Sequence, residues 1–461
     1  MRRPSNTLRR SRTARPFVGG YGLLGRRTPK AHGSGTFSAM AQDRVEWARR
    51  TPKPKHMRND ATQDMPEAGP GIGEHVFLTG ATGLLGAHLA RRILRSHPQT
   101  RLSLLVRSTP QETAEQRVEK VVSPTLGDVE GGAIRDRVEV IEGDIALPGF
   151  GWTAHVTEQI RARVDHVIHC AATIRFDLPL DVARRDNTEG TRHVLDFARR
   201  TPRLGRLDYI GTAYVAGCRE GTIKEDELDV GQRFWNSYEQ TKMEAEKLVR
   251  AFGANHPAAI HRPSIIVGDS RTGQTTAFQG LYQLLPLYLR RLVLAIPADP
   301  ETPIDLVPID YVVDTLFALM RTTRSIGRSF HVVAGPDATC TFDELLRIAS
   351  EFTKIKPPPY VSLETYNRFV KPVFHAVLWG KRRAATLKGE HYLPYLSSKK
   401  IFDKTNTDAV AGLGIAIPHP SSYFRRLVAF QARALQLAIG DDPVDDPPIA
   451  ESAPARIGIW P

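Results

Sequence analysis

The feature that most constrains the fold is a glycine-rich turn between a short apolar strand and an amphipathic helix. Residues 75–79 (HVFLT) predict the strand, TGATGLLG follows, and a helical pattern runs from Ala87 to Arg95. Glycines at this spacing allow a tight turn and let a pyrophosphate approach the backbone, while the helix N-terminus supplies N–H donors. A glycine triplet also occurs as a purely structural turn, but the strand–turn–helix context favours dinucleotide binding. The turn residues assigned to the cofactor are Gly80, Thr82, Gly83, Leu84, Leu85 and Gly86.

Further short apolar segments recur along the chain, several of them separated by spacers of helical length. These segments are residues 102–106, 138–141, 164–170, 206–211 and 258–261. Strands that alternate with helices predict a parallel sheet with crossover helices on both faces. The expected fold class is α/β, a Rossmann doubly wound parallel sheet with a smaller, mostly helical C-terminal substrate cap.

Proline and glycine divide the chain into four expected parts. The alternation loosens after about residue 270, and the pattern becomes helical with interruptions after Pro336. The expected parts are a disordered basic extension at 1–73, an NAD(P)-binding Rossmann domain with substrate-cap insertions at 74–335, a helical substrate-binding cap at 336–440, and a loose tail at 441–461.

The net charge of +13 is concentrated near the N-terminus. Residues 1–70 hold 15 Lys and Arg against 5 Asp and Glu, whereas the remainder holds 48 against 45. Such a basic segment cannot bury enough apolar surface to offset its ordering entropy, and it fits either an organelle transit peptide or a misassigned start codon. The nearly neutral body argues against nucleic acid as a partner. We expect a cytoplasmic, bacterial-type location, with organelle targeting left open.

The sequence indicates neither a membrane span nor a metal site. No run approaches about 18 consecutive apolar residues, although peripheral membrane contact stays open. The three cysteines, Cys170, Cys218 and Cys340, show no CxxC spacing, so we expect no disulfide framework and no cysteine zinc site. The oligomeric state is left open.

The end of the second predicted strand indicates which nicotinamide cofactor is used. An acidic residue there binds a ribose 2′-hydroxyl, whereas a basic residue accommodates a 2′-phosphate. LSLLV runs into Arg107, and no Asp or Glu occurs before Glu112, which favours NADPH. A solvated loop position is the alternative interpretation of Arg107. Asp144 and Ile145 close the third strand, where an adenine amino group could be met, and a turn-forming role for Asp144 is also open.

A tyrosine and a lysine four residues apart are the catalytic candidates. Tyr238 and Lys242 share one face of a predicted helix, so the ammonium would lower the pKa of the phenol toward the range useful for proton transfer. Upstream, Thr212 ends a predicted strand, where its hydroxyl would donate to a substrate carbonyl oxygen. Such pairs also occur on solvated helices, but the order of glycine turn, threonine, tyrosine and lysine favours catalysis.

These motifs together resemble the extended short-chain dehydrogenase/reductase superfamily, and within it the thioester reductase-like group that includes fatty acyl-CoA reductases. The resemblance covers about residues 75–340 and rests on TGATGLLG, VEVIEGDIALPGFG, DHVIHCAATIRFD, NTEGT, GTAYVAG, YEQTK, HRPSIIVGDSRTG and IDLVPIDYVVD. It implies that Thr212, Tyr238 and Lys242 form the catalytic set, with the last two also contacting the cofactor. Gly211 stands where the family commonly has Ser, which leaves Thr212 as the acting hydroxyl.

The resemblance also implies further residues around the cofactor. These are Ala171 and Ala172 in the cradle, Asn187 as a structural helper or a helix cap, and Arg262 with Pro263 near the nicotinamide.

The activity implied by the resemblance is NADPH-dependent reduction of an acyl thioester, borne by coenzyme A or a carrier, to an aldehyde and onward to an alcohol. Residues 278–296 would line an acyl channel or form ordinary core helices, while Arg290, Arg291 and residues 381–383 would meet phosphates or lie on a solvated surface. Three alternatives stay open: a ketone or sterol-type oxidoreductase, a nucleotide-sugar epimerase, and a non-enzymatic NADP-sensing scaffold.

Overall fold

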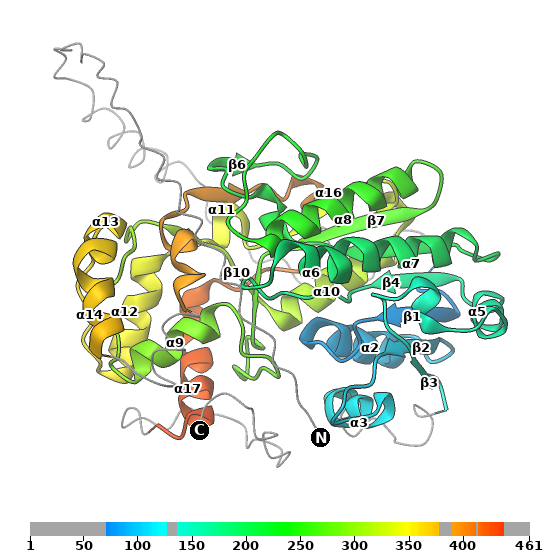
Figure 1. Ribbon diagram of the computed structural model, residues 1–461, viewed down its shortest axis with the longest axis horizontal. Helices are drawn as coiled ribbons and strands as arrows, with labels where there is room; N and C mark the ends of the chain where they lie inside the picture. Colours follow the sequence, from blue (N-terminus) through cyan, green and yellow to red (C-terminus); the bar gives the residue numbers. More distant parts are fainter. Residues whose placement is uncertain (1–70, 127–135, 378–388, 412–413, 438–461) are drawn as a thin grey trace, which may run out of the picture. The chain divides into compact units, whose positions relative to one another are not determined.

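The computed structural model describes residues 71–126, 136–377, 389–411 and 414–437 (Figure 1). The basic residues 1–70 and the expected tail at 441–461 lie outside these described residues. Among the described helices, none is long and apolar enough to cross a membrane.

Seven parallel strands form the central sheet. In order across the sheet they are β11 (Ser329–Val332), β7 (Ala258–Pro263), β5 (Arg206–Ile210), β4 (His166–His169), β1 (His75–Thr79), β2 (Arg101–Val106) and β3 (Val138–Glu142). The order reverses between β1 and β4, and ligands of open α/β sheets bind beyond the strand carboxyl ends at such a reversal. The expected doubly wound parallel sheet is confirmed.

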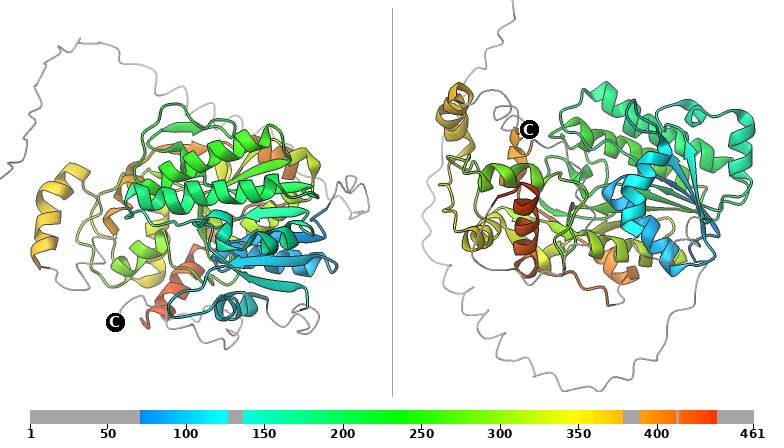
Figure 2. Two further views of the ribbon diagram at one scale, coloured as in Figure 1. Left: turned by 45° about the vertical axis from the view of Figure 1, so that its right-hand side comes forward. Right: turned by 90° about the horizontal axis from the view of Figure 1, so that it is seen from below.

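Helices cover both faces of this sheet (Figure 2). One face packs against α2 (Leu84–Ser96), α3 (Ala114–Leu126) and α10 (Ile309–Met320), the other against α5 (Ala154–Arg161), α7 (Gly190–Arg199) and α8 (Ser237–Gly253). Along β1, Val76 and Leu78 join the first of these cores and Phe77 joins the second, because successive strand side chains point to opposite faces. Burial on both faces explains why HVFLT is apolar almost throughout.

A second apolar core lies in the C-terminal part of the chain. It is built from α9 (Leu281–Leu289), α12 (Phe342–Thr353) and α17 (Phe424–Ala434). A capping box begins α12: the Thr341 hydroxyl accepts from Glu344 N at 3.2 Å, and the Glu344 carboxylate accepts from Thr341 N at 2.7 Å. The helical cap expected at 336–440 thus shares its core with α9, which precedes residue 336. The bounds of this expected cap stay a prediction.

Between α12 and α17 the chain returns to the central sheet. There, β13 (Lys400–Phe402) pairs in parallel with β6 (Gly221–Ile223), and α16 (Thr405–Ala411) packs on β11. The shorter described elements are η1 (Pro148–Gly151), α6 (Leu180–Arg184), η2 (Arg185–Glu189), η3 (Ala213–Ala216), β6 (Gly221–Ile223), β8 (Ile265–Val267), β9 (Pro303–Ile304), β10 (Leu306–Pro308), η4 (Thr323–Ser325), α11 (Gly335–Ala338), β12 (Cys340–Thr341), α13 (Leu363–Thr365), η5 (Tyr366–Val370), α14 (Lys371–Val377), η6 (Leu393–Ser397), β13 (Lys400–Phe402), α16 (Thr405–Ala411) and η7 (Pro420–Ser422).

Candidate active site

A cavity of about 1570 Å³ lies at the carboxyl ends of the central strands and extends to α9 and α17 of the second core. The site residues predicted from the sequence that line it are Gly80, Thr82, Gly83, Leu84, Leu85, Gly86, Ala172, Thr212, Tyr238, Lys242 and Pro263. The predicted site residues outside its lining are Arg107, Asp144, Ile145, Ala171 and Asn187. The structure therefore brings the glycine turn and the candidate catalytic set to one enclosure.

The glycine turn leaves bare backbone facing this cavity. Gly80 has φ +78°, and a Cβ there would lie 2.6 Å from Ala171 N. A Cβ at Gly86 would lie 2.2 Å from Gly80 O, so the helix could not start so close to the strand. Gly83 N donates to Gly80 O at 3.0 Å, which closes the turn. A turn of this shape at a helix N-terminus fits the pyrophosphate of a dinucleotide.

Thr212 and Tyr238 meet on one wall of the cavity. Thr212 follows β5, and its hydroxyl oxygen accepts from Tyr214 N at 3.2 Å. Tyr238 lies in the first turn of α8, and Asn236 caps that helix with a side chain that accepts from Glu239 N at 3.0 Å. Desolvation raises the pKa of Tyr238 to about 12, and a hydrogen bond with Thr212 opposes that rise. The phenol therefore holds its proton at neutral pH, as a proton donor must.

Lys242 lies one turn further along α8 and is 3% exposed. Its ammonium donates to Ile210 O at 2.8 Å and lies 4.4 Å from the ring centroid of Tyr209. Burial lowers the pKa of Lys242 to about 8. The sequence argument that Lys242 lowers the pKa of Tyr238 is corrected here: that pKa is raised, because desolvation dominates and the ammonium is directed at a backbone carbonyl.

Asn187 braces the loop that follows β4. Its side-chain oxygen accepts from Thr173 N at 2.8 Å, and its amide donates to Thr173 O and to Thr241 Oγ1, each at 3.0 Å. Asn187 lies inside η2, where it caps no helix, so of the two roles expected from the sequence the structure shows the structural one. Ala171 N donates to Thr79 Oγ1 at 3.2 Å, and Ala172 faces the cavity.

Two arginines lie beside the glycine turn, of which the sequence analysis named one. Arg107 follows β2 with its side chain 58% exposed and forms a 3.7 Å ion pair with Asp144. Arg117 of α3, which the sequence analysis missed, donates to Arg107 O at 2.6 Å and to Thr82 Oγ1 at 3.1 Å. The pattern around Arg117 is that of an ordinary amphipathic helix, so no local signal marks it.

Asp144 and Ile145 have structural contacts at the end of β3. Asp144 Oδ1 accepts from Ala146 N at 2.9 Å, which is the turn-forming role that the sequence allowed. Ile145 O accepts from His193 Nδ1 at 2.7 Å. The Ile145 side chain packs closely on Gly190, because a Cβ added at Gly190 would lie 2.9 Å from Ile145 Cδ1.

Aromatic side chains form a cluster beside Tyr238. Phe176 stacks on Tyr238 with ring centroids 5.7 Å apart, and it also contacts the rings of Tyr392 and Tyr395. Tyr395 accepts from Asn236 Nδ2 at 2.7 Å and donates to Glu239 Oε1 at 2.5 Å.

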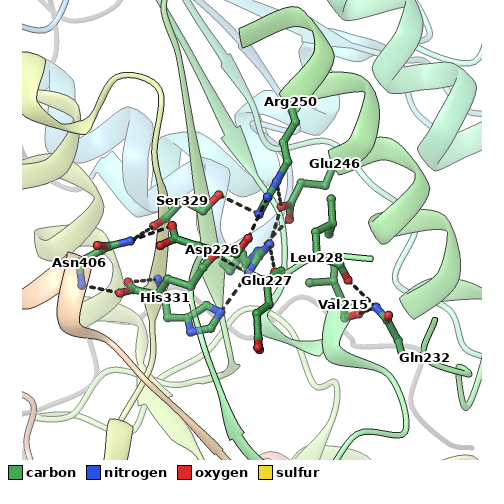
Figure 3. A network of polar contacts seen from close by, with 12 residues as sticks. Val215, Asp226, Glu227, Leu228, Gln232, Glu246, Arg250, Ser329, His331 and Asn406 are labelled. Carbon is green, nitrogen blue, oxygen red and sulfur yellow. Dashed lines mark hydrogen bonds and ion pairs between the residues drawn. The ribbon is translucent and has the colours of Figure 1, made fainter. Parts of the chain in front are cut away.

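Arg262, expected near the nicotinamide, does not line the cavity. It is fully buried and binds Glu246 of α8 through two hydrogen bonds of 2.9 and 2.6 Å. Figure 3 shows the surrounding network, in which Glu246, Ser329, His331 and Asn406 converge from α8, β11 and α16. This buried ion pair joins α8 to β7, while the next residue of β7, Pro263, lines the cavity.

Metal chemistry has no obvious centre in the part of the chain that the structure describes. No three His, Cys, Asp or Glu side chains there lie close enough together to hold a metal ion.

Comparison with known proteins places the chain in a family. The model of the male sterility protein family, an NAD-binding domain, matches residues 78–316. Fatty acyl-CoA reductase 1 of Gallus gallus is 30% identical over 280 residues, 53% of this chain and 54% of that protein. The chain thus spans about half the length of that relative.

Solved structures agree with the fold. The terminal R domain from the myxalamid PKS-NRPS biosynthetic pathway is 26% identical, with a TM-score of 0.69 over 80% of this chain and 92% of that chain. UDP-glucuronic acid 4-epimerase from Bacillus cereus is 16% identical, with a TM-score of 0.56 over 78% of this chain and 98% of that chain, a likeness of fold alone. The glycine turn, the parallel sheet and the match over more than half of its residues show that this chain belongs to the male sterility protein family, within the thioester reductase-like group of extended short-chain dehydrogenases/reductases.

Proposed function

We propose that this protein is an NADPH-dependent reductase of acyl thioesters. The observation that carries the proposal is the composition of one cavity. Its wall holds the glycine turn, Thr212, Tyr238 and Lys242, and its far part is lined by apolar side chains of α9, α12 and α17. A reactive polar end joined to a large apolar space fits a substrate with a reducible carbonyl on an apolar chain.

The nicotinamide, when bound, supplies a hydride to the thioester carbonyl carbon. Thr212 and Tyr238 donate hydrogen bonds to the carbonyl oxygen as negative charge develops on it. In the structure the Thr212 hydroxyl accepts from Tyr214 N and donates to Pro263 O at a long 3.4 Å, so its proton would turn from that carbonyl to the substrate oxygen. Tyr238 then transfers its proton to that oxygen, which gives a hemithioacetal, and the phenol is reprotonated from solvent.

Collapse of the hemithioacetal breaks the carbon–sulfur bond. The oxygen gives up its proton, the carbonyl re-forms as an aldehyde, and the thiol leaves with a proton. One thioester and one NADPH with a proton thus yield one aldehyde, one thiol and NADP⁺. A second hydride transfer in the same site converts the aldehyde to an alcohol.

The preference for NADPH rests on the arginines beside the turn. Arg117 holds both Thr82 and the backbone of Arg107, so two guanidinium groups lie near the end of β2. A 2′-phosphate at this place would meet both positive charges, whereas a 2′-hydroxyl would bring no negative charge to them.

A nucleotide-sugar epimerase is less well supported by the cavity. A sugar needs many hydrogen-bond partners, yet the wall beyond Tyr238 is dominated by residues such as Leu284, Leu285 and Leu346. An anaerobic assay that measures NADPH oxidation and free-thiol release from a long-chain acyl-CoA tests the proposal. Equal amounts of NADP⁺ and thiol are expected when reduction stops at the aldehyde, and twice as much NADP⁺ when it continues to the alcohol. Oxidation or reduction of a ketone or a UDP-sugar without thiol release would contradict it.

A further inference from the structure

A group of basic side chains lines a part of the cavity wall that the proposed reaction does not use. Arg91 lies on α2, one turn after His88, and Arg271 lies in the loop that follows β8. All three side chains line the same cavity as Tyr238. We call these three residues the basic rim.

Within the described part of the chain, no hydrogen bond or ion pair joins the Arg91 guanidinium to another residue. Burial, together with repulsion from Arg95 and Arg271, lowers the pKa of Arg91, and attraction to Asp269 opposes that effect only in part. A half-buried guanidinium among like charges is unfavourable until an anion binds between them.

The carboxylate near the basic rim is already engaged. Asp269 Oδ1 accepts from Arg271 N and Thr272 N, each at 3.0 Å, and from the Thr272 hydroxyl at 3.1 Å. The other oxygen, Asp269 Oδ2, forms a 3.3 Å ion pair with the Arg271 guanidinium. Asp269 therefore shapes the loop that carries Arg271 and offsets the charge of that arginine, whereas Arg91 forms no such ion pair with a described residue.

The loop that carries Arg271 is held on two sides. Asp310 of α10 accepts from Ser270 N at 3.0 Å and from the Ser270 hydroxyl at 2.6 Å. On the other side, Arg426 of α17 donates to Ser270 O at 3.4 Å. Because α2 also packs on α10, the two arginines are positioned by a common support.

The pyrophosphate of the cofactor does not account for the basic rim. It is served by the glycine turn at the start of α2, and Arg91 follows Gly83 by eight residues, roughly 12 Å along the helix axis. The basic residues singled out from the sequence for phosphate also lie elsewhere, since Arg290 and Arg291 follow α9 and residues 381–383 are outside the described residues.

We propose that the basic rim binds the phosphate of a phosphopantetheine thiol, the handle on which the acyl group enters the cavity. This inference rests on the proposed function. Arginine pairs with phosphate through two parallel hydrogen bonds, and a phosphate held at Arg91 and Arg271 would leave the pantetheine arm to extend toward Thr212. Coenzyme A and carrier proteins share this group.

The test uses one acyl chain on four thiols: coenzyme A, 4′-phosphopantetheine, pantetheine and N-acetylcysteamine. Wild-type protein is expected to show a KM about tenfold lower for the two phosphate-bearing substrates. Arg91→Ala and Arg271→Ala should each remove most of that advantage while leaving kcat/KM for the two phosphate-free thioesters and the KM for NADPH unchanged. Arg92→Ala is the matched control, because Arg92 forms an exposed ion pair with Asp314 and does not line the cavity.

An acylated carrier protein bearing the same acyl chain distinguishes coenzyme A from a carrier protein as the source of the phosphate. If the two arginine substitutions raise the KM for acyl-CoA alone, the basic rim is assigned to coenzyme A. If they raise the KM for both substrates, it is assigned to the phosphate that both share. Equal KM values on all four thiols would overturn the inference and leave the proposed function standing. A rise in the KM for NADPH in Arg91→Ala would also overturn it, since the rim would then belong to the cofactor. Absence of thiol release from all four substrates with wild-type protein would instead overturn the proposed function.

Discussion

The hydroxyl of Tyr395 donates a 2.5 Å hydrogen bond to the buried carboxylate of Glu239, so a residue of the returning C-terminal segment holds the helix that carries Tyr238. Glu239 also accepts from Trp235 N at 2.9 Å, and burial raises its pKa. Helix α8, which carries Tyr238, is therefore held at its first turn by Tyr395 and further along by the buried pair of Glu246 and Arg262.

Tyr395→Phe is expected to lower the free energy of unfolding by about 1–3 kcal/mol, because a buried carboxylate loses a donor. Since burial raises the pKa of Glu239, the folded protein binds this proton more tightly than the unfolded chain, and the stability from this group falls as pH rises. Loss of Tyr395 raises the pKa further, so the destabilisation should be larger at pH 8 than at pH 5. Chemical denaturation at both pH values measures it.

Tyr360→Phe is the matched control for that substitution. The Tyr360 hydroxyl also donates to a carboxylate, Asp343 Oδ1 at 3.0 Å, but at an exposed position. Removal of the Tyr360 hydroxyl should lower the free energy of unfolding by no more than about 0.5 kcal/mol. Equal effects of the two substitutions would show that Tyr395 does not hold α8.

Tyr238→Phe should reduce single-turnover thioester reduction by about 10²- to 10⁴-fold, because the variant lacks the proton donor and one oxyanion hydrogen bond. The Kd for NADPH, measured by fluorescence titration, should barely change. Near wild-type turnover would mean that the hydroxyl of Tyr238 takes no part in the reaction.

Lys242 should make NADPH binding sensitive to pH. Because burial lowers its pKa to about 8, the ammonium is present below pH 8 and is lost as the pH rises through that value. The Kd for NADPH should then rise about tenfold toward pH 9.5, as one charge-assisted hydrogen bond disappears. Lys242→Met should bind weakly at every pH, and an unchanged pH profile in this variant would contradict the assignment.

NADPH should be used at least about tenfold better than NADH, since a charge-assisted contact to the 2′-phosphate contributes roughly 1.5–3 kcal/mol. Arg107→Asp should reverse this preference. Arg117→Ala should make the preference smaller, because Arg117 holds Arg107 and Thr82 in place. The preference is measured as the ratio of kcat/KM for NADPH to kcat/KM for NADH. Equal efficiency in the wild-type protein would remove the role given to Arg107.

Gly80→Ala should abolish NADPH binding and destabilise the fold, because its Cβ would meet Ala171 N at 2.6 Å. Gly221→Ala is a matched control: its φ of +76° is close to that of Gly80 at +78°, but no atom lies within 4 Å of the added Cβ. Both variants carry the cost of a left-handed backbone, about 1–2 kcal/mol, and only Gly80→Ala adds a collision. Similar thermal shifts in the two would show that the contact with Ala171 is unimportant.

The class of fold and the catalytic candidates were predictable because both depend on patterns that are local in the sequence. Apolar strand segments separated by helical spacers specify a parallel sheet without reference to distant residues, and this expectation is confirmed. Gly80 and Gly86 were recognisable because the turn itself requires them. Thr212, Tyr238 and Lys242 were named from their order along the chain, and the structure brings them to one cavity.

The remaining features of the site depend on contacts that no local pattern contains. Arg117 reaches Thr82 across 35 residues, and Tyr395 reaches Glu239 across 156. The pKa of Tyr238 could not be deduced from Lys242 alone, because it is set mainly by the desolvation that surrounding segments impose. Likewise, Arg262 turns to Glu246 instead of the cavity, since a buried guanidinium requires a carboxylate. Sequence order thus determined which residues are candidates for the site, whereas tertiary packing decided their charges, their partners and the position of the basic rim on the cavity wall.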